Sequence, residues 1–126
     1  MVSLGVRALS VEEDAARKAH GVITHDARQL MRDETHAITL PEDFPENVYI
    51  TFDLDGLDPS VLPSTGTPVP GGLGFYQALD LVESAAHGRN VKGIDVVELA
   101  PVSGQPASDF TAAMISYHLM RIALDT

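Results

Sequence analysis

The sequence predicts an α/β fold of three layers, in which a parallel sheet lies between helices. Three apolar runs typical of buried strands alternate with segments whose apolar residues recur at helical spacing. The order β-α-β-α-β-α implies parallel strands joined by right-handed crossovers, with helices on the faces of the sheet. A chain of 126 residues is long enough for one such domain with a modest core.

The first third of the chain predicts one strand and two helices. Residues 1–9 form a short apolar run typical of a buried strand. Ser10 and Glu13 have the spacing of a capping box, so a helix is expected to begin here and to end near Gly21. A second helical piece is expected over residues 25–32.

The middle of the chain predicts a turn, a strand and a helix. Two prolines place the turn around residues 42–46. Residues 48–54 are nearly all apolar or β-prone, as expected of a strand covered on both faces of a parallel sheet. The helix that follows is expected to end at Gly88, and its apolar stripe consists of Phe75, Leu79, Val82 and Ala86.

The last third predicts a strand, a loop and a helix. Residues 91–99 are the third apolar run, and residues 101–106 form the loop after it. Ser108 or Asp109 is expected to cap a final helix that extends to about Leu124 and is apolar over most of its surface.

The net charge of the chain indicates which kinds of molecule it is expected to bind. The chain carries 18 acidic and 8 basic residues, a formal net charge of −10. Nucleic acids and anionic membranes attract basic proteins, so we expect neither as a partner. A metal cation or a cationic small molecule fits this charge better. The sequence has no cysteine, no signal-peptide pattern and no membrane-spanning apolar run, so a cytoplasmic location is expected.

Three carboxylates follow two of the predicted strands. Asp53 and Asp55 lie two residues apart at the end of one strand, and Glu98 lies near the end of the next. Ligands collect at the carboxyl ends of parallel strands, so neighbouring strands would bring these side chains to one edge. Such an oxygen-rich site suits Mn²⁺ or Mg²⁺ better than zinc. The structural alternative is that the aspartates only cap and form the following turn.

Other polar residues nearby have structural explanations. Asp58 precedes Pro59 and is expected to form a turn by hydrogen-bonding its own backbone. The loop over residues 66–72 is either a rigid connector or a wall over the strand ends. The histidines share no ligand spacing and are expected at the surface: His20, His25, His36, His87 and His118.

A strand followed by Asp53-Leu-Asp55-Gly56 also resembles the nucleophile motif of haloacid-dehalogenase-type phosphatases. There Asp53 would be the nucleophile and Asp55 the general acid, with Mg²⁺ as cofactor. That motif normally lies in the first strand and continues with Thr or Val, whereas here the strand is the second and Leu57 follows. A phosphatase is therefore kept only as an alternative prediction.

Three ordered motifs resemble the ureohydrolases, the family that includes arginase and agmatinase. They are TFDLDGLDP at residues 51–59, GTPVPGGL at 66–73 and DVVELAP at 95–101. Gly5-Val6-Arg7 and the C-terminal helix are most similar to agmatinases. The resemblance implies a three-layer α/β/α fold with a parallel sheet, of which residues 1–126 form a single partial domain, the C-terminal part.

The resemblance also implies a chemistry. Ureohydrolases use two Mn²⁺ ions to hydrolyse guanidino compounds, and the likeness to agmatinases implies that agmatine is converted to putrescine and urea. Asp53 resembles a catalytic carboxylate that bridges both ions, and Asp55 resembles the metal ligand of a single ion. Glu98 resembles the catalytic residue that pairs with the substrate guanidinium. Thr67 lies in the loop that forms a wall beside the substrate.

Two family motifs that supply further metal ligands, Gly-Gly-Asp-His and Asp-Ala-His-x-Asp, do not occur in the sequence. Two aspartates alone cannot give two Mn²⁺ ions their normal coordination number. The expected enzyme therefore needs a further segment, and a non-catalytic truncated homologue or assembly module is the alternative. The expected partners are a small cationic guanidino substrate and further copies in a homo-oligomer. An unpaired sheet edge is expected to make the isolated chain associate.

Overall fold

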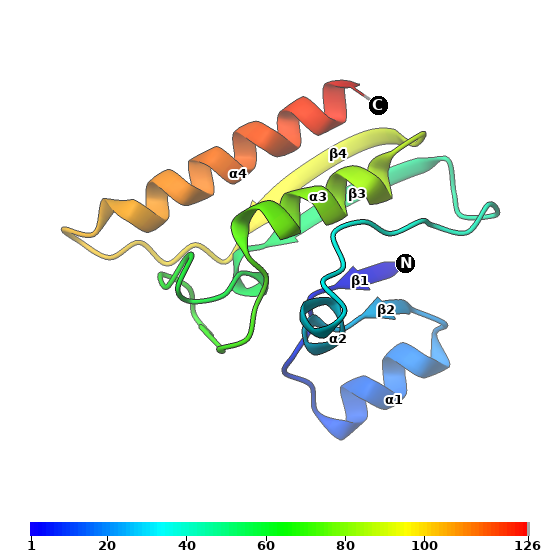
Figure 1. Ribbon diagram of the computed structural model, residues 1–126, viewed down its shortest axis with the longest axis horizontal. Coiled ribbons are helices and arrows are strands. Elements are labelled where there is room, and N and C mark those ends of the chain that lie inside the picture. The colour runs from blue at the N-terminus through cyan, green and yellow to red at the C-terminus, as the bar shows by residue number, and fades with distance from the viewer. Residues whose placement is uncertain (126) are drawn as a thin grey trace.

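A computed structural model describes residues 1–125 as an α/β protein (Figure 1). Each strand is followed by a helix, as predicted, but four β-α units occur where three are expected. The elements in chain order are β1 (Val2–Leu4), α1 (Val11–Ala19), β2 (Ile23–His25), α2 (Ala27–Arg32), β3 (Asn47–Asp53), the 3-10 turn η1 (Leu54–Gly56), α3 (Phe75–Ala86), β4 (Asn90–Val97) and α4 (Pro106–Asp125).

The four strands form two separate parallel sheets. β1 pairs with β2, and β3 pairs with β4 in a register that sets Asp53 opposite Val97. The predicted α/β class and parallel strands are confirmed. The predicted helix over residues 25–32 is wrong at its start, because His25 is the last residue of β2 and the helix begins at Ala27. His25 is half-buried in this strand rather than on the surface.

β1 is shorter than the predicted strand over residues 1–9. It ends at Leu4 because Gly5 has a φ of +78°, which turns the chain out of the extended conformation. Two backbone bonds continue the pairing beyond it: Gly5 N–H donates to His25 O at 2.9 Å, and Ala27 N–H donates to Val6 O at 3.0 Å. These bonds position the start of α2 against the end of β1.

The core lies between β3–β4 and the helices α3 and α4. Figure 1 shows both helices along the same side of this sheet. The inner face of the sheet presents Phe52 and the partly buried Ile94 to a cluster that includes the fully buried Leu81 of α3 and Leu119 of α4. Each such leucine contributes roughly 1.5–3 kcal/mol by leaving water, so this layer holds the strand ends in place.

The other face of β3–β4 is exposed in residues 1–125, so the prediction that β3 is covered on both faces is not met within them. Burial alternates along β3, and Tyr49 is 63% exposed. The Tyr49 ring lies against Gly93 of β4, where an added Cβ would come within 2.6 Å of the ring. Its hydroxyl donates to Asp95 at 3.0 Å, and this carboxylate raises the pKa of Tyr49.

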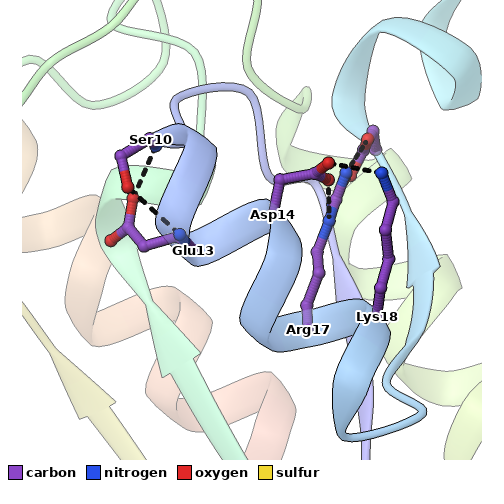
Figure 2. Close-up of polar contacts among 6 residues, drawn as sticks. Ser10, Glu13, Asp14, Arg17 and Lys18 are labelled. Carbon is purple, nitrogen blue, oxygen red and sulfur yellow. Dashed lines mark hydrogen bonds and ion pairs between the residues drawn. The ribbon is translucent and has the colours of Figure 1, made fainter.

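The predicted capping box of α1 is confirmed and is drawn in Figure 2. Glu13 N–H donates to Ser10 Oγ at 3.1 Å, and Ser10 N–H donates to a Glu13 carboxylate oxygen at 2.7 Å. No residue of α1 is buried. The capping box satisfies two backbone N–H groups at the start of this exposed helix.

Ion pairs lie along α1, and one of them connects it to the residue before α2 (Figure 2). Arg17 reaches Asp26, which precedes α2, at 2.7 Å and Asp14 at 2.8 Å. Asp26 and then Asp14 raise the pKa of Arg17. Lys18 and then Arg17 hold the pKa of Asp14 below its usual value. Of these pairs, Arg17–Asp26 leaves α1 and ties it to the residue before α2, whereas the others lie within α1.

α4 begins at Pro106, before both predicted caps, Ser108 and Asp109, because the fixed φ of proline suits the first turn of a helix. Its inner side is buried, and its outer side exposes large apolar residues, as predicted: Phe110, Tyr117, Met120 and Leu124. Within residues 1–125, no helix combines the length and apolar character that crossing a membrane requires.

Replacement of Ser10 by alanine removes one half of the capping box. We expect Ser10→Ala to lower the free energy of unfolding by about 1 kcal/mol, because the first turn of α1 loses a hydrogen-bond acceptor. Urea denaturation followed by circular dichroism measures this loss. Ser10→Asp keeps an acceptor and is the control, so equal losses in the two variants would contradict the capping role.

Candidate functional site

The acidic site begins at Asp53, where β3 ends one residue earlier than predicted. The chain then turns through η1, and Asp55 N–H donates to Asp53 Oδ1 at 2.8 Å. Asp53 therefore caps the turn through one of its oxygens, as the structural alternative expects. The turn, and not the alternation of a strand, sets the relation between the two aspartates.

Asp55 has one carboxylate oxygen that is engaged and one that is not. The Thr67 hydroxyl donates to Oδ2, whereas Oδ1 is buried and has no hydrogen-bond partner among residues 1–125. Burial raises the pKa of Asp55, but the neighbouring Thr65 side chain, the Thr67 hydroxyl and backbone, and the charge of Arg7 outweigh it and lower the pKa. The group is therefore ionised at neutral pH, with Oδ1 unsatisfied.

Asp58 organises the loop that carries Thr67. Its Oδ2 accepts backbone N–H groups from Gly71 at 2.8 Å and Gly72 at 3.1 Å. Its Oδ1 accepts the Ser60 hydroxyl at 2.6 Å and the Ser60 N–H at 3.0 Å. The Ser60 hydroxyl, followed by the backbone donors, lowers the pKa of Asp58 to about 2. The predicted turn role of Asp58 is confirmed, and it extends to closing the loop.

Arg7 holds the same loop from the side of β1. Its Nε donates to Val69 O at 2.8 Å, and its Nη2 donates to Val69 O at 2.5 Å and to Leu57 O at 3.2 Å. Sequence reasoning noted Arg7 only as a family likeness and missed this role. It also missed Thr65, whose buried Oγ1 lacks a hydrogen-bond partner within residues 1–125. No local pattern marks Arg7, because Leu57 and Val69 are distant from it in sequence.

Glu98 approaches the loop from the end of β4. It has a φ of +69°, a left-handed conformation that costs an ordinary residue roughly 1–2 kcal/mol. Its Oε2 lies 4.0 Å from the position that a Cβ would occupy at Gly66, beside Thr67. A bond from Ala100 N–H to Ser64 O at 2.9 Å joins the two loops. The strand ends therefore bring Asp53, Asp55, Thr67 and Glu98 to one edge of β3–β4.

The donor set fits part of a divalent-cation site. Carboxylate oxygens are the ligands that Mn²⁺ and Mg²⁺ prefer, and the unsatisfied Asp55 Oδ1 is available for such an ion. Residues 1–125 contain no group of three or more Asp, Glu or His side chains placed to hold one metal ion. Asp53 and Asp55 therefore fit as two ligands of a set that needs others.

A comparison with known families shows to which family the chain belongs. Residues 1–122 match the sequence model of the Arginase family. The chain belongs to the arginase family. This membership confirms the resemblance and the α/β class, with residues 1–126 corresponding to a part of the arginase-like fold. It also counts against the haloacid-dehalogenase alternative, which shares only the short acidic motif.

The proteins similar to this chain include ureohydrolases named for different substrates and an arginase-like protein. An N(1)-aminopropylagmatine ureohydrolase of Thermus thermophilus is 38% identical over 118 residues, which are 94% of this chain and 40% of that protein. The agmatinase of Chromobacterium violaceum is 54% identical over 65 residues, 52% of this chain and 19% of the relative. A triple mutant of the T. brucei arginase-like protein, bound with Mn²⁺, superposes with a TM-score of 0.79 at 30% identity, over 98% of this chain and 41% of that one.

The chain thus spans about 40% of the length of the Thermus relative, although nearly all of the chain is matched. The geometry places the predicted residues Asp53, Asp55, Thr67 and Glu98 at a shared edge. Their roles as metal, catalytic and substrate-binding residues stay predictions.

The pKa of Asp58 makes stability depend on acid pH. Its folded value of about 2 lies below the ordinary 3.8, so the ionised group stabilises the fold above pH 3.8 and this contribution is lost as the pH falls through 2. We expect Asp58→Asn to be less stable than the original chain at pH 7 and the difference to shrink toward pH 2. Urea denaturation across this range measures it, with Asp43→Asn as a control of equal charge. A difference that stays constant down to pH 2 would contradict the assignment.

Gly72 is required by its contact with the backbone. A Cβ at this position would lie 2.5 Å from Leu57 C and 2.6 Å from Leu57 O, and backbone atoms cannot move aside as a flexible side chain can. We expect Gly72→Ala to destabilise the chain by roughly 1–3 kcal/mol through overpacking. Gly56→Ala is the control, because no atom lies within 4 Å of its Cβ position. Thermal unfolding compares the two, and equal effects would refute the steric explanation.

Proposed function

We propose that this chain carries part of the active site of a manganese-dependent ureohydrolase that acts on agmatine. Water adds to the guanidino carbon, the bond from that carbon to the alkyl nitrogen breaks, and the leaving amine takes a proton, which yields putrescine and urea. The observation that carries the proposal is the unsatisfied, ionised Asp55 beside Asp53 at the end of β3. Its setting in an arginase-family chain supports the choice of reaction.

Asp53 and Asp55 would hold manganese through their carboxylate oxygens. The bound metal supplies a water molecule of lowered pKa at neutral pH. The Thr67 hydroxyl fixes Asp55 through Oδ2 and leaves Oδ1 for the ion. The low pKa of Asp55 keeps it ionised without the metal. These contacts prepare the carboxylate in advance, which reduces the reorganisation that binding requires.

Glu98 would orient the substrate. A guanidinium group donates two parallel hydrogen bonds to a carboxylate, and this pairing fixes both its position and its plane. The Glu98 carboxylate lies near Gly66, on the loop that also holds Asp55 through Thr67. Its left-handed backbone is the kind of local strain that clusters at functional sites.

We prefer agmatine to arginine as the proposed substrate because two of the similar proteins are named for agmatine or a derivative of it. The most identical stretch compared above is to an agmatinase, at 54% over 65 residues, and the Thermus relative is named as an N(1)-aminopropylagmatine ureohydrolase. The net charge of −10 is compatible with a dication such as agmatine. The proposed substrate carries no anionic group.

The test combines this chain with the part of the Thermus relative that lies outside their match, called here the complementing segment. With Mn²⁺, we expect urea release from agmatine by the combination but not by the chain alone. Asp55→Asn should lower this rate at least about 100-fold. Mutation of a residue that only hydrogen-bonds to a metal ligand already lowers metal affinity or activity by about 10–100-fold. Asp43→Asn removes the same charge from the turn before β3 and should leave the rate unchanged.

Two results would count against the proposal. No urea from the combination, with metal binding unaffected by Asp55→Asn, would favour a non-catalytic homologue or assembly module. Tight binding of two Mn²⁺ ions by the 126-residue chain alone in calorimetry would contradict an incomplete ligand set, because residues 1–125 place no third acidic or histidine side chain with Asp53 and Asp55.

A further inference from the structure

Thr65 lies in a loop that contacts both the chain after β3 and the chain after β4. The residue before it, Ser64, is buried, and its carbonyl accepts the N–H of Ala100 at 2.9 Å. Two residues after Thr65, the Thr67 hydroxyl donates to Asp55 Oδ2. Thr65 is therefore held between two fixed points of this loop, at the edge of the sheet where the candidate site lies.

Two buried oxygen atoms of the site lack a hydrogen bond. They are Thr65 Oγ1 and Asp55 Oδ1, and neither has a partner within residues 1–125. A hydroxyl can donate a hydrogen bond, whereas an ionised carboxylate can only accept one, so the two groups are complementary. A buried polar atom without a partner costs free energy, and such atoms are uncommon in native proteins. A pair of them in one loop therefore points to a function.

The Thr65 side chain is a close neighbour of the Asp55 carboxylate. Burial raises the pKa of Asp55, and the Thr65 side chain is the largest of the contributions that outweigh burial. The Thr65 hydroxyl nevertheless does not meet the geometry of a hydrogen bond to any group within residues 1–125. A small movement of the side chain would complete a bond to Asp55, because a hydroxyl proton rotates to suit its acceptor.

Asp55 has enough acceptor capacity for both threonines and an ion. Each oxygen of a carboxylate offers two lone pairs. Thr67 uses one of those on Oδ2. A bond from Thr65 would use one of those on Oδ1 and leave the other for a cation. Hydrogen bonds of this kind, from residues behind a metal ligand, fix the orientation of the ligand and strengthen metal binding.

We infer that Thr65 is a positioning residue of the candidate metal site. Its hydroxyl donates to Asp55 Oδ1 when that oxygen binds a divalent cation, so that Thr65 and Thr67 hold the two carboxylate oxygens from one loop. The inference rests on the proposed function, because it takes Asp55 to be a metal ligand. In this role Thr65 touches neither the substrate nor the reacting atoms, so it acts on metal affinity.

The alternative is a purely structural role, in which a buried water molecule is the partner of the Thr65 hydroxyl. The two roles differ in what loss of the hydroxyl does. A hydroxyl that is hydrogen-bonded to structural water stabilises the fold whether or not a metal is bound. A hydroxyl that pairs with Asp55 only in the metal-bound protein contributes to metal binding, and its removal leaves the free energy of unfolding of the chain alone unchanged or higher.

Replacement of Thr65 by valine keeps the shape of the side chain and removes the hydroxyl. The complementing segment is joined to Met1 by a flexible Gly/Ser linker, so that weak association cannot hide the effect. We expect Thr65→Val to weaken Mn²⁺ binding in calorimetry at least about 10-fold, and excess Mn²⁺ to restore urea release. Thr65→Ser keeps the hydroxyl and should bind Mn²⁺ nearly as the original does. Thr111→Val, which removes a hydroxyl that bonds to Ala107 O in α4, is the matched control and should not change Mn²⁺ binding.

The outcomes separate this inference from the proposed function. Mn²⁺ binding that is weakened by Asp55→Asn but not by Thr65→Val would overturn the role of Thr65 and leave the proposed function standing. Equal weakening by Thr65→Val and Thr65→Ser would also overturn it, because the hydroxyl would then not be responsible. A lower free energy of unfolding of the Thr65→Val chain alone, measured in urea without metal, would favour the structural role instead. Mn²⁺ binding that Asp55→Asn does not weaken would overturn both proposals.

Discussion

The parallel pairing of β3 with β4 is the interaction on which the rest of the molecule depends. Its register sets Asp53 opposite Val97, so Asp53 and the following Glu98 lie at the same edge of the sheet. The same pairing presents Phe52 and Ile94 on one face, where α3 and α4 cover them. A slip of one residue would turn that face outward, and the core and the acidic site would be lost together.

Elements with a clear local signal were predictable from the sequence. The capping box located α1, the apolar stripe located α3, and the long apolar run located β3. β2 has only three residues, too few to show a period, and it is a strand because β1 lies beside it. The exposed face of β3 was also unpredictable, because an apolar run does not say which other elements cover it.

In the candidate site too, some residues have a local sequence signal and others are placed only by contacts between distant segments. Asp53, Asp55 and Asp58 follow from their spacing, and the turn role of Asp58 follows from the proline after it. Arg7 contacts Val69, 62 residues away, and this contact exists only after β1 and the loop have come together. The unsatisfied oxygen of Asp55 has no signature in the sequence either. Residue types alone predict a carboxylate-rich site, but they do not reveal the residues that support it.

Together with the substrate-orienting role proposed for Glu98, its left-handed backbone implies a conflict between folding and activity at this one position. Glycine would adopt a φ of +69° without steric cost, and asparagine would do so more readily than glutamate. Selection for stability alone would therefore favour replacing Glu98, by roughly 1 kcal/mol or more. A screen for thermostable variants is expected to collect glycine or asparagine here. A screen that also demands turnover should keep the carboxylate and the strain that accompanies it.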